Sequence, residues 1–97
     1  MKLRILPAAL ADLDNIDAHI ASTFGVPFAV KTQNRLLETF ELLVEFPHMG
    51  HTRPDITGRP VRFFHRKPYW IVYSLGEPLL IHRVYHAARD LGRIEKS

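Results

Sequence analysis

The segment Tyr69-Trp-Ile-Val-Tyr-Ser-Leu75 decides the fold. It is rich in aromatic and β-branched residues, the types that are enriched in strands, and it predicts a strand over residues 69–75. Lys67-Pro68 before it and Gly76-Glu-Pro78 after it are tight-turn signals. The segments on the far sides of these turns, residues 61–66 and 79–86, are predicted strands too. Two short turns imply that the three strands form an antiparallel meander.

Two helices precede this meander. Apolar residues recur at spacings of three and four along residues 8–24, which predicts an amphipathic helix after a short first strand over residues 2–6. Pro27 opens a second helix over residues 27–45, and the short link makes the pair an antiparallel hairpin. The residues expected to be mostly buried are Leu13, Ile16, Ile20, Leu36, Phe40, Leu43, Ile71 and Val84.

The predicted fold class is therefore α+β, with the order β-α-α-β-β-β. The helical hairpin packs on one face of a four-stranded, mostly antiparallel sheet, and the other face is left partly exposed with basic side chains. The 97 residues form a single domain spanning residues 1–97. The chain has no cysteine, which excludes disulfides and thiolate metal sites, and we expect no metal or cofactor. We expect a cytoplasmic protein without a membrane span.

The two halves of the chain differ in charge. Residues 1–50 contain four Lys or Arg and six Asp or Glu, whereas residues 51–97 contain nine and four. Four of the six histidines also lie in the second half. This division predicts a slightly acidic scaffold joined to a basic binding surface.

The basic residues end in a distinctive run, Arg83-Val-Tyr-His-Ala-Ala-Arg-Asp90. It closes the last predicted strand with two arginines and a histidine, which suits contact with an acidic surface or a phosphate. Strict alternation along this strand places Leu80, His82, Val84 and His86 on one face.

Several motifs along nearly the whole chain resemble those of the ParE branch of the RelE/ParE toxins. They are Pro7-Ala-Ala-Leu-Ala-Asp-Leu13, Phe46-Pro-His-Met-Gly50, Arg53-Pro-Asp55, Val61-Arg62, Ile71-Val-Tyr73 and the run that ends the last strand. The resemblance implies the RelE/ParE-like fold and the toxin of a type II toxin–antitoxin pair. Such a toxin takes part in plasmid stabilization and is held inactive by a cognate, ParD-like antitoxin. It binds DNA gyrase as its target and does not bind DNA by itself.

Two candidate surfaces follow from these observations. We expect the target to contact the basic residues Arg62, Arg83, His86 and Arg89. We expect an amphipathic helix of the antitoxin to lie in a groove near the two helices, with a strand added to a sheet edge as a second contact. The candidate antitoxin-binding residues are Leu10, Leu13, Leu37 and Phe40.

Two other functions stay open. A RelE-like, ribosome-dependent mRNA endoribonuclease would need a base, an acid and a cation near one phosphate. Its candidates are Arg62, His65, Arg83 and His86. Arg83 and His86 lie three residues apart on a strand, so they point to opposite faces unless a bulge or bend follows Val84, and we favour a binding toxin over an enzyme. The second alternative is a non-toxic family member that acts only within an antitoxin complex.

Overall fold

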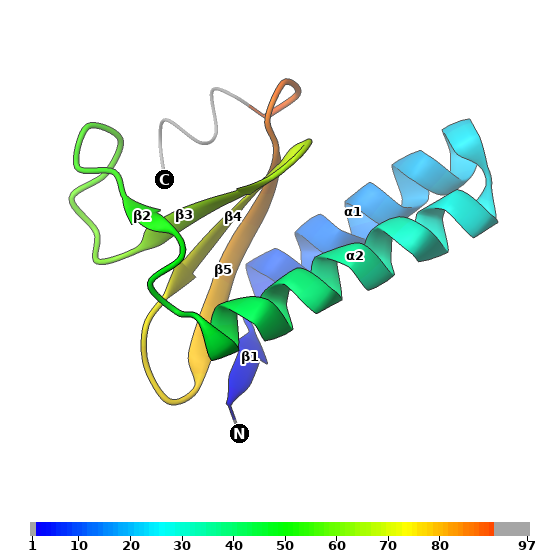
Figure 1. The fold of residues 1–97 in the computed structure, drawn as a ribbon. Coiled ribbons are helices and arrows are strands. Elements are labelled where there is room, and N and C mark those ends of the chain that lie inside the picture. The colour runs from blue at the N-terminus through cyan, green and yellow to red at the C-terminus, as the bar shows by residue number, and fades with distance from the viewer. Residues whose placement is uncertain (1, 91–97) are drawn as a thin grey trace.

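The computed structural model describes residues 2–90 of the chain, and its elements follow the predicted order with one addition. They are β1 (Leu3–Ile5), α1 (Pro7–Phe24), α2 (Val26–Glu45), β2 (His51–Thr52), β3 (Arg62–Arg66), β4 (Tyr69–Ser74) and β5 (Leu79–His86). The two helices lie side by side as a hairpin against a twisted sheet (Figure 1). The α+β class is confirmed, and each predicted helix and strand is found with its ends within one residue of the predicted positions.

The sheet has five strands in the order β1-β5-β4-β3-β2. β1 pairs in parallel with β5, and the remaining neighbours are antiparallel. The prediction of four strands missed β2, whose two residues, His51 and Thr52, pair with Phe63 and Arg62. Two polar residues in a proline-rich connection carry no alternation, so no local pattern could reveal this strand.

A buried network fixes the chain just before β2. The Tyr73 hydroxyl accepts a hydrogen bond from the Gly50 N–H at 2.8 Å and donates to the Pro47 carbonyl oxygen at 2.7 Å. The Arg62 guanidinium donates to the Gly50 carbonyl oxygen at 2.7 Å. A Cβ on residue 50 would lie 2.6 Å from the Tyr73 hydroxyl oxygen, so only glycine allows this close approach.

The core lies between the hairpin and the sheet. All eight residues expected to be buried are buried, and the cluster also includes Tyr73, Ile81 and Leu79. Gly25 turns the chain between the helices with φ of 96°, a conformation that favours glycine. Neither helix in the described part of the chain combines the length and the apolar character that a membrane span requires.

The second face of the sheet differs from the prediction. Val61, Phe63, Val72 and Tyr85 form a second buried cluster there, and Ile56 and Trp70 pack against it. The expectation of a partly exposed basic face is therefore wrong at its centre. The connection between β2 and β3 supplies Ile56 and Val61, so this loop covers apolar side chains of the sheet.

An irregularity in β5 changes which side chains face the hairpin. Tyr73 is opposite Ile81, but the preceding residue of β4, Val72, is opposite Arg83, so His82 is an extra residue in the ladder. Ile81 and Val84 consequently both join the main core. Strict alternation would have placed them on opposite faces, and the predicted face shared by Leu80, His82, Val84 and His86 is therefore wrong.

Candidate functional site

Three of the four predicted target-binding residues lie together at the end of β5: Arg83, His86 and Arg89. We call them the C-terminal basic site. The fourth, Arg62, lies elsewhere along the sheet. Its cross-strand neighbours are Tyr73 and then Ile81, whereas those of His86 are Tyr69 and then Arg66. Arg62 and Arg66 are four residues apart on β3, or about 13 Å.

The C-terminal basic site is built around the carboxylate of Asp12 in α1. Both carboxylate oxygens accept hydrogen bonds from Arg83, through Nε and Nη2, each at 2.8 Å. One oxygen also accepts the backbone N–H of Val84 at 2.9 Å. Asp12 is only 6% exposed, so the carboxylate that ties the first helix to the last strand is buried, whereas Arg83 stays partly exposed.

Carboxylates complete the edge of β5 where β1 ends. β1 pairs only with residues 79–81 of β5, and the chain then leaves the sheet to start α1. Beyond that point Asp12 accepts the N–H of Val84, and Asp90 accepts the N–H of His86 at 2.8 Å. These outward backbone donors are therefore satisfied by side chains in place of a neighbouring strand.

Arg83 is less available to a target than the sequence predicted. It shares a face with Tyr85, and its guanidinium carbon lies 4.9 Å from the centre of that ring. From there the guanidinium reaches around the strand edge to Asp12 on the hairpin side. The hydrogen bonds to Asp12 raise the pKa of Arg83. Because its positive charge is neutralised within the fold, Arg83 is first a structural residue.

His86 and Arg89 are coupled through the backbone. The Arg89 N–H donates to His86 Nδ1 at 3.0 Å, so this ring nitrogen carries no proton and Nε2 is the one available as a donor. Burial lowers the pKa of His86, and the positive charge of Arg89 lowers it further. His86 is therefore a neutral hydrogen-bonding group at neutral pH.

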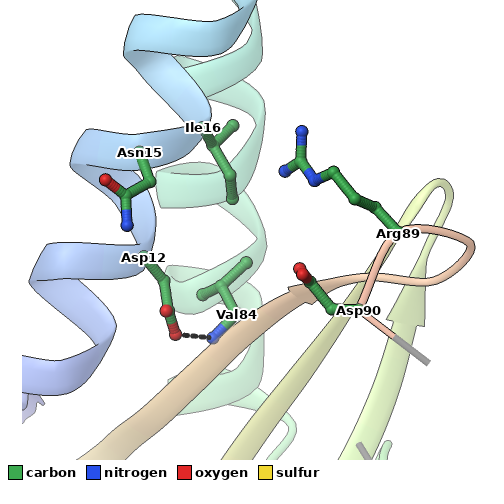
Figure 2. Close-up of a pocket in the computed structure, with 6 residues that line it drawn as sticks. All are labelled: Asp12, Asn15, Ile16, Val84, Arg89 and Asp90. Atoms are coloured by element: carbon green, nitrogen blue, oxygen red, sulfur yellow. Dashed lines mark hydrogen bonds between the residues drawn. The ribbon is translucent and has the colours of Figure 1, made fainter. Parts of the chain in front are cut away.

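Arg89 borders a small polar pocket of about 220 Å³ between α1 and the residues that follow β5. Its side chain extends back toward α1 near Ile16, and the Asp90 carboxylate lies below it (Figure 2). The guanidinium forms no ion pair with any residue between 2 and 90. Among the residues that the structure describes, Arg89 is thus the cation of the C-terminal basic site that is exposed and forms no ion pair.

The four residues of the nuclease hypothesis do not converge. Arg62 and His86 belong to cross-strand rows that face the hairpin, together with Tyr73 and Tyr69. His65 stacks on Trp70 at 4.5 Å on the other face. Arg83 is bound to Asp12 at the strand edge. No three of these four residues therefore surround one phosphate site.

The four predicted antitoxin-binding residues fall into two groups. Leu13 is 7% and Phe40 0% exposed, so both are core residues that a docked partner cannot touch, and their assignment is corrected. Leu10 is 49% and Leu37 41% exposed, and both stay available on the hairpin surface. All four were assigned from helical spacing alone. Such spacing does not distinguish an apolar residue that faces the core from a neighbouring one that faces a partner.

Asp12 was not among the predicted site residues and was named only as part of the motif Pro7-Ala-Ala-Leu-Ala-Asp-Leu13. The signal was its position, three residues after Ala9 and four before Ile16, both of which are buried. An acid on the inward side of an amphipathic helix requires a buried partner. His19, Arg35 and Tyr69 were also not predicted as site residues, and they line a pocket that includes His86.

We predict that Asp12→Asn lowers the free energy of unfolding by about 3 kcal/mol, the low end for breaking a buried ion pair, because Arg83 is partly exposed. The matched control is Asp14→Asn in the same helix, which is exposed and should change stability by less than about 0.5 kcal/mol. Urea denaturation followed by circular dichroism measures both. Equal stability of the two variants would show that the Asp12–Arg83 contact contributes nothing to the fold.

The comparisons with known proteins agree with this architecture. The family described as "ParE toxin of type II toxin-antitoxin system, parDE" matches residues 3–91. Toxin ParE3 of Caulobacter vibrioides is 34% identical over 82 residues, which cover 82% of this chain and 80% of that protein. A solved structure, described as the chromosomal ParDE TA system from P. aeruginosa, has a TM-score of 0.74 and 27% identity. That match covers 89% of this chain and 95% of the other. The chain therefore belongs to the ParE toxin family of type II toxin–antitoxin systems.

Proposed function

We propose that this ParE-family toxin is a binding poison of DNA gyrase rather than a ribonuclease. It acts in the cytoplasm, contributes to plasmid stabilization and is neutralised by a ParD-like antitoxin. One fold serves gyrase poisons and mRNA nucleases in the wider superfamily, so only the residues of the site can distinguish the two functions.

The observation that carries this proposal is the separation of the four candidate nuclease residues. General acid–base cleavage needs a proton donor and acceptor within about 3 Å of the reacting groups. The register divides Arg62, His65 and His86 between two faces of the sheet. The guanidinium of Arg83 is bound to Asp12. What the end of β5 offers is a charge and hydrogen-bond donors, which suit binding.

The charge at this site favours an acidic protein surface. Arg89 is exposed and unneutralised among residues 2–90, whereas Arg83 is paired. A charge at the rim of an interface steers association and fixes orientation. His86 adds a neutral hydrogen-bond donor next to Arg89. Arg89 can therefore bind a carboxylate of the target while His86 binds a neighbouring polar group.

We predict that Arg89→Ala reduces growth inhibition about tenfold, equivalent to about 1.4 kcal/mol of target binding. His86→Ala should have a smaller effect, because a binding poison transfers no proton. Arg59→Ala removes an exposed arginine from the connection between β2 and β3 and serves as the matched control. Plating of cells that express each variant, with folding checked by circular dichroism, measures the effect.

The nuclease alternative predicts the opposite order, since loss of a general acid or base costs about 10²–10⁴ in rate. His86→Ala would then abolish growth inhibition, and Arg89→Ala would have the smaller effect. A supercoiling assay with purified gyrase and the wild-type toxin gives the direct readout. Messenger RNA cut at the ribosome, with supercoiling unaffected, would contradict the proposed function. A wild-type chain that does not stop growth would favour the non-toxic alternative.

The antitoxin is proposed to dock on the outer surface of the hairpin. Four apolar side chains of the two helices are each more than 40% exposed: Leu10, Val30, Leu37 and Leu42. Together they give the hairpin a large exposed apolar surface. An amphipathic partner helix would cover such side chains. A specific complex needs about 1,000 Å² or more of buried area, which exposed residues on both helices could supply.

We predict that Leu37→Asp weakens binding of the cognate antitoxin about 30-fold, the equivalent of a hot-spot loss of about 2 kcal/mol. Leu75→Asp is the matched control, because Leu75 is 42% exposed against 41% for Leu37 but lies after β4 at the turn to β5. Calorimetric titration of each purified variant with the ParD-like protein measures the affinities. Equal affinities for the two variants would place the antitoxin elsewhere.

A further inference from the structure

A second pocket, next to the C-terminal basic site, has both an aromatic and a basic lining. It lies between the outer half of the hairpin and the end of the sheet, and its volume is about 220 Å³. The residues used in the argument are His19 and Phe24 of α1, Phe28 and Arg35 of α2, Tyr69 of β4, and His86 of β5. We call this cavity the aromatic–basic pocket.

One wall of the aromatic–basic pocket is apolar and exposed. The rings of Phe24 and Phe28 lie 5.6 Å apart, centre to centre. Phe24 is 66% and Phe28 54% exposed. Neither ring contributes to the buried core, although burial of aromatic rings is a main source of stability in small domains. Two adjacent exposed phenylalanines beside a cavity are typical of a protein-binding surface.

The lining also includes a basic residue, Arg35. Among residues 2–90, no aspartate or glutamate lines this pocket. Arg35 forms no ion pair with residues 2–90, and the same holds for Arg89 just outside. Burial raises the pKa of the Tyr69 phenol, and the positive charges of Arg89 and Arg35 oppose that rise, so both guanidinium groups act on this hydroxyl. The Tyr69 ring contacts His86 edge-on at 5.7 Å.

We propose that the aromatic–basic pocket binds an acidic, apolar segment of the target protein. An apolar side chain would lie against Phe24 and Phe28, and a neighbouring carboxylate would accept hydrogen bonds from Arg35 and Tyr69. This assignment rests on the proposed function, because it extends the target-binding surface from Arg89 across His86 to the hairpin. The pocket is smaller than the roughly 300–1,000 Å³ of small-molecule sites, so it suits side chains of a docked segment.

The charges around the pocket favour a peptide over a nucleic acid. Affinity for a nucleic acid comes chiefly from several Lys and Arg side chains that neutralise phosphates. Among residues 2–90, two guanidinium groups here form no ion pair, those of Arg35 and Arg89, and His86 is neutral. Asp14 and Asp17 are exposed on α1, so the same helix would repel a long polyanion. A short segment with one or two carboxylates avoids most of that repulsion.

The test is a titration of the full-length chain with two tetrapeptides. Binding is monitored through the NMR signals of the histidine imidazoles. The probe is acetyl-Asp-Leu-Phe-Glu-amide, and its uncharged counterpart is acetyl-Asn-Leu-Phe-Gln-amide. We expect the acidic peptide to shift His19 and His86 saturably and to bind roughly tenfold more tightly than the uncharged one. His48 and His51 lie outside the pocket and should not shift.

Two variants locate the contacts. Arg35→Gln should weaken the acidic peptide about tenfold and leave the uncharged one unchanged. Lys31→Gln, which removes the same charge from an exposed position of the same helix, should change neither. Phe28→Ser should weaken both peptides, because it removes the apolar contact that they share. Phe28 and Arg35 are exposed, so these substitutions leave the core intact.

Equal binding of the two peptides, or no effect of Arg35→Gln, would overturn the proposal. Tighter binding of hexauridylate than of the acidic peptide would overturn it in favour of a nucleic-acid site. The titration contains neither gyrase nor antitoxin, so its result is independent of the proposed function. Full toxicity of Arg35→Gln would remove the pocket from the target-binding surface, whereas full toxicity of Arg89→Ala would count against the proposed function itself.

Discussion

The structure depends on one carboxylate, that of Asp12. β1 is short and leaves the edge of β5 uncovered after Ile81, just where the strand carries Arg83 and Val84 toward the basic end of the chain. Asp12 accepts three hydrogen bonds there, two from the guanidinium and one from the backbone. A buried carboxylate is costly unless it is paired and fully hydrogen-bonded, and this one is both. The contact joins residues that are 71 and 72 positions apart in the chain.

This contact determines which charges the toxin presents. By pairing with Arg83, Asp12 neutralises one of the two arginines of the final run, and Arg89 is the more exposed of the two. Asp90 then completes the strand edge at His86. A strand edge lined by two carboxylates is protected from pairing with another chain. The end of β5 therefore favours recognition through side chains over addition of a strand.

Sequence patterns predicted the elements well, because the helices have clear periodicity and the meander has clear turns. They missed β2, since two polar residues show no period. They also missed the extra residue at His82, because a bulge leaves no local mark and reverses the face of every residue after it. The pairing of Asp12 with Arg83 and the gathering of Arg35, Tyr69 and His86 at one pocket depend on tertiary packing, which spacing along one element cannot reveal.

Amide hydrogen exchange at Val84 tests most directly whether the Asp12 carboxylate closes the edge of β5. If it does, the free energy of the opening that exposes the Val84 N–H should lie within about 1 kcal/mol of the opening free energy at Ile71, in the middle of the sheet. In Asp12→Asn, the protection at Val84 should fall more than that at Ile71. Rapid exchange of Val84 in the wild-type chain, as at an uncovered strand edge, would contradict this account.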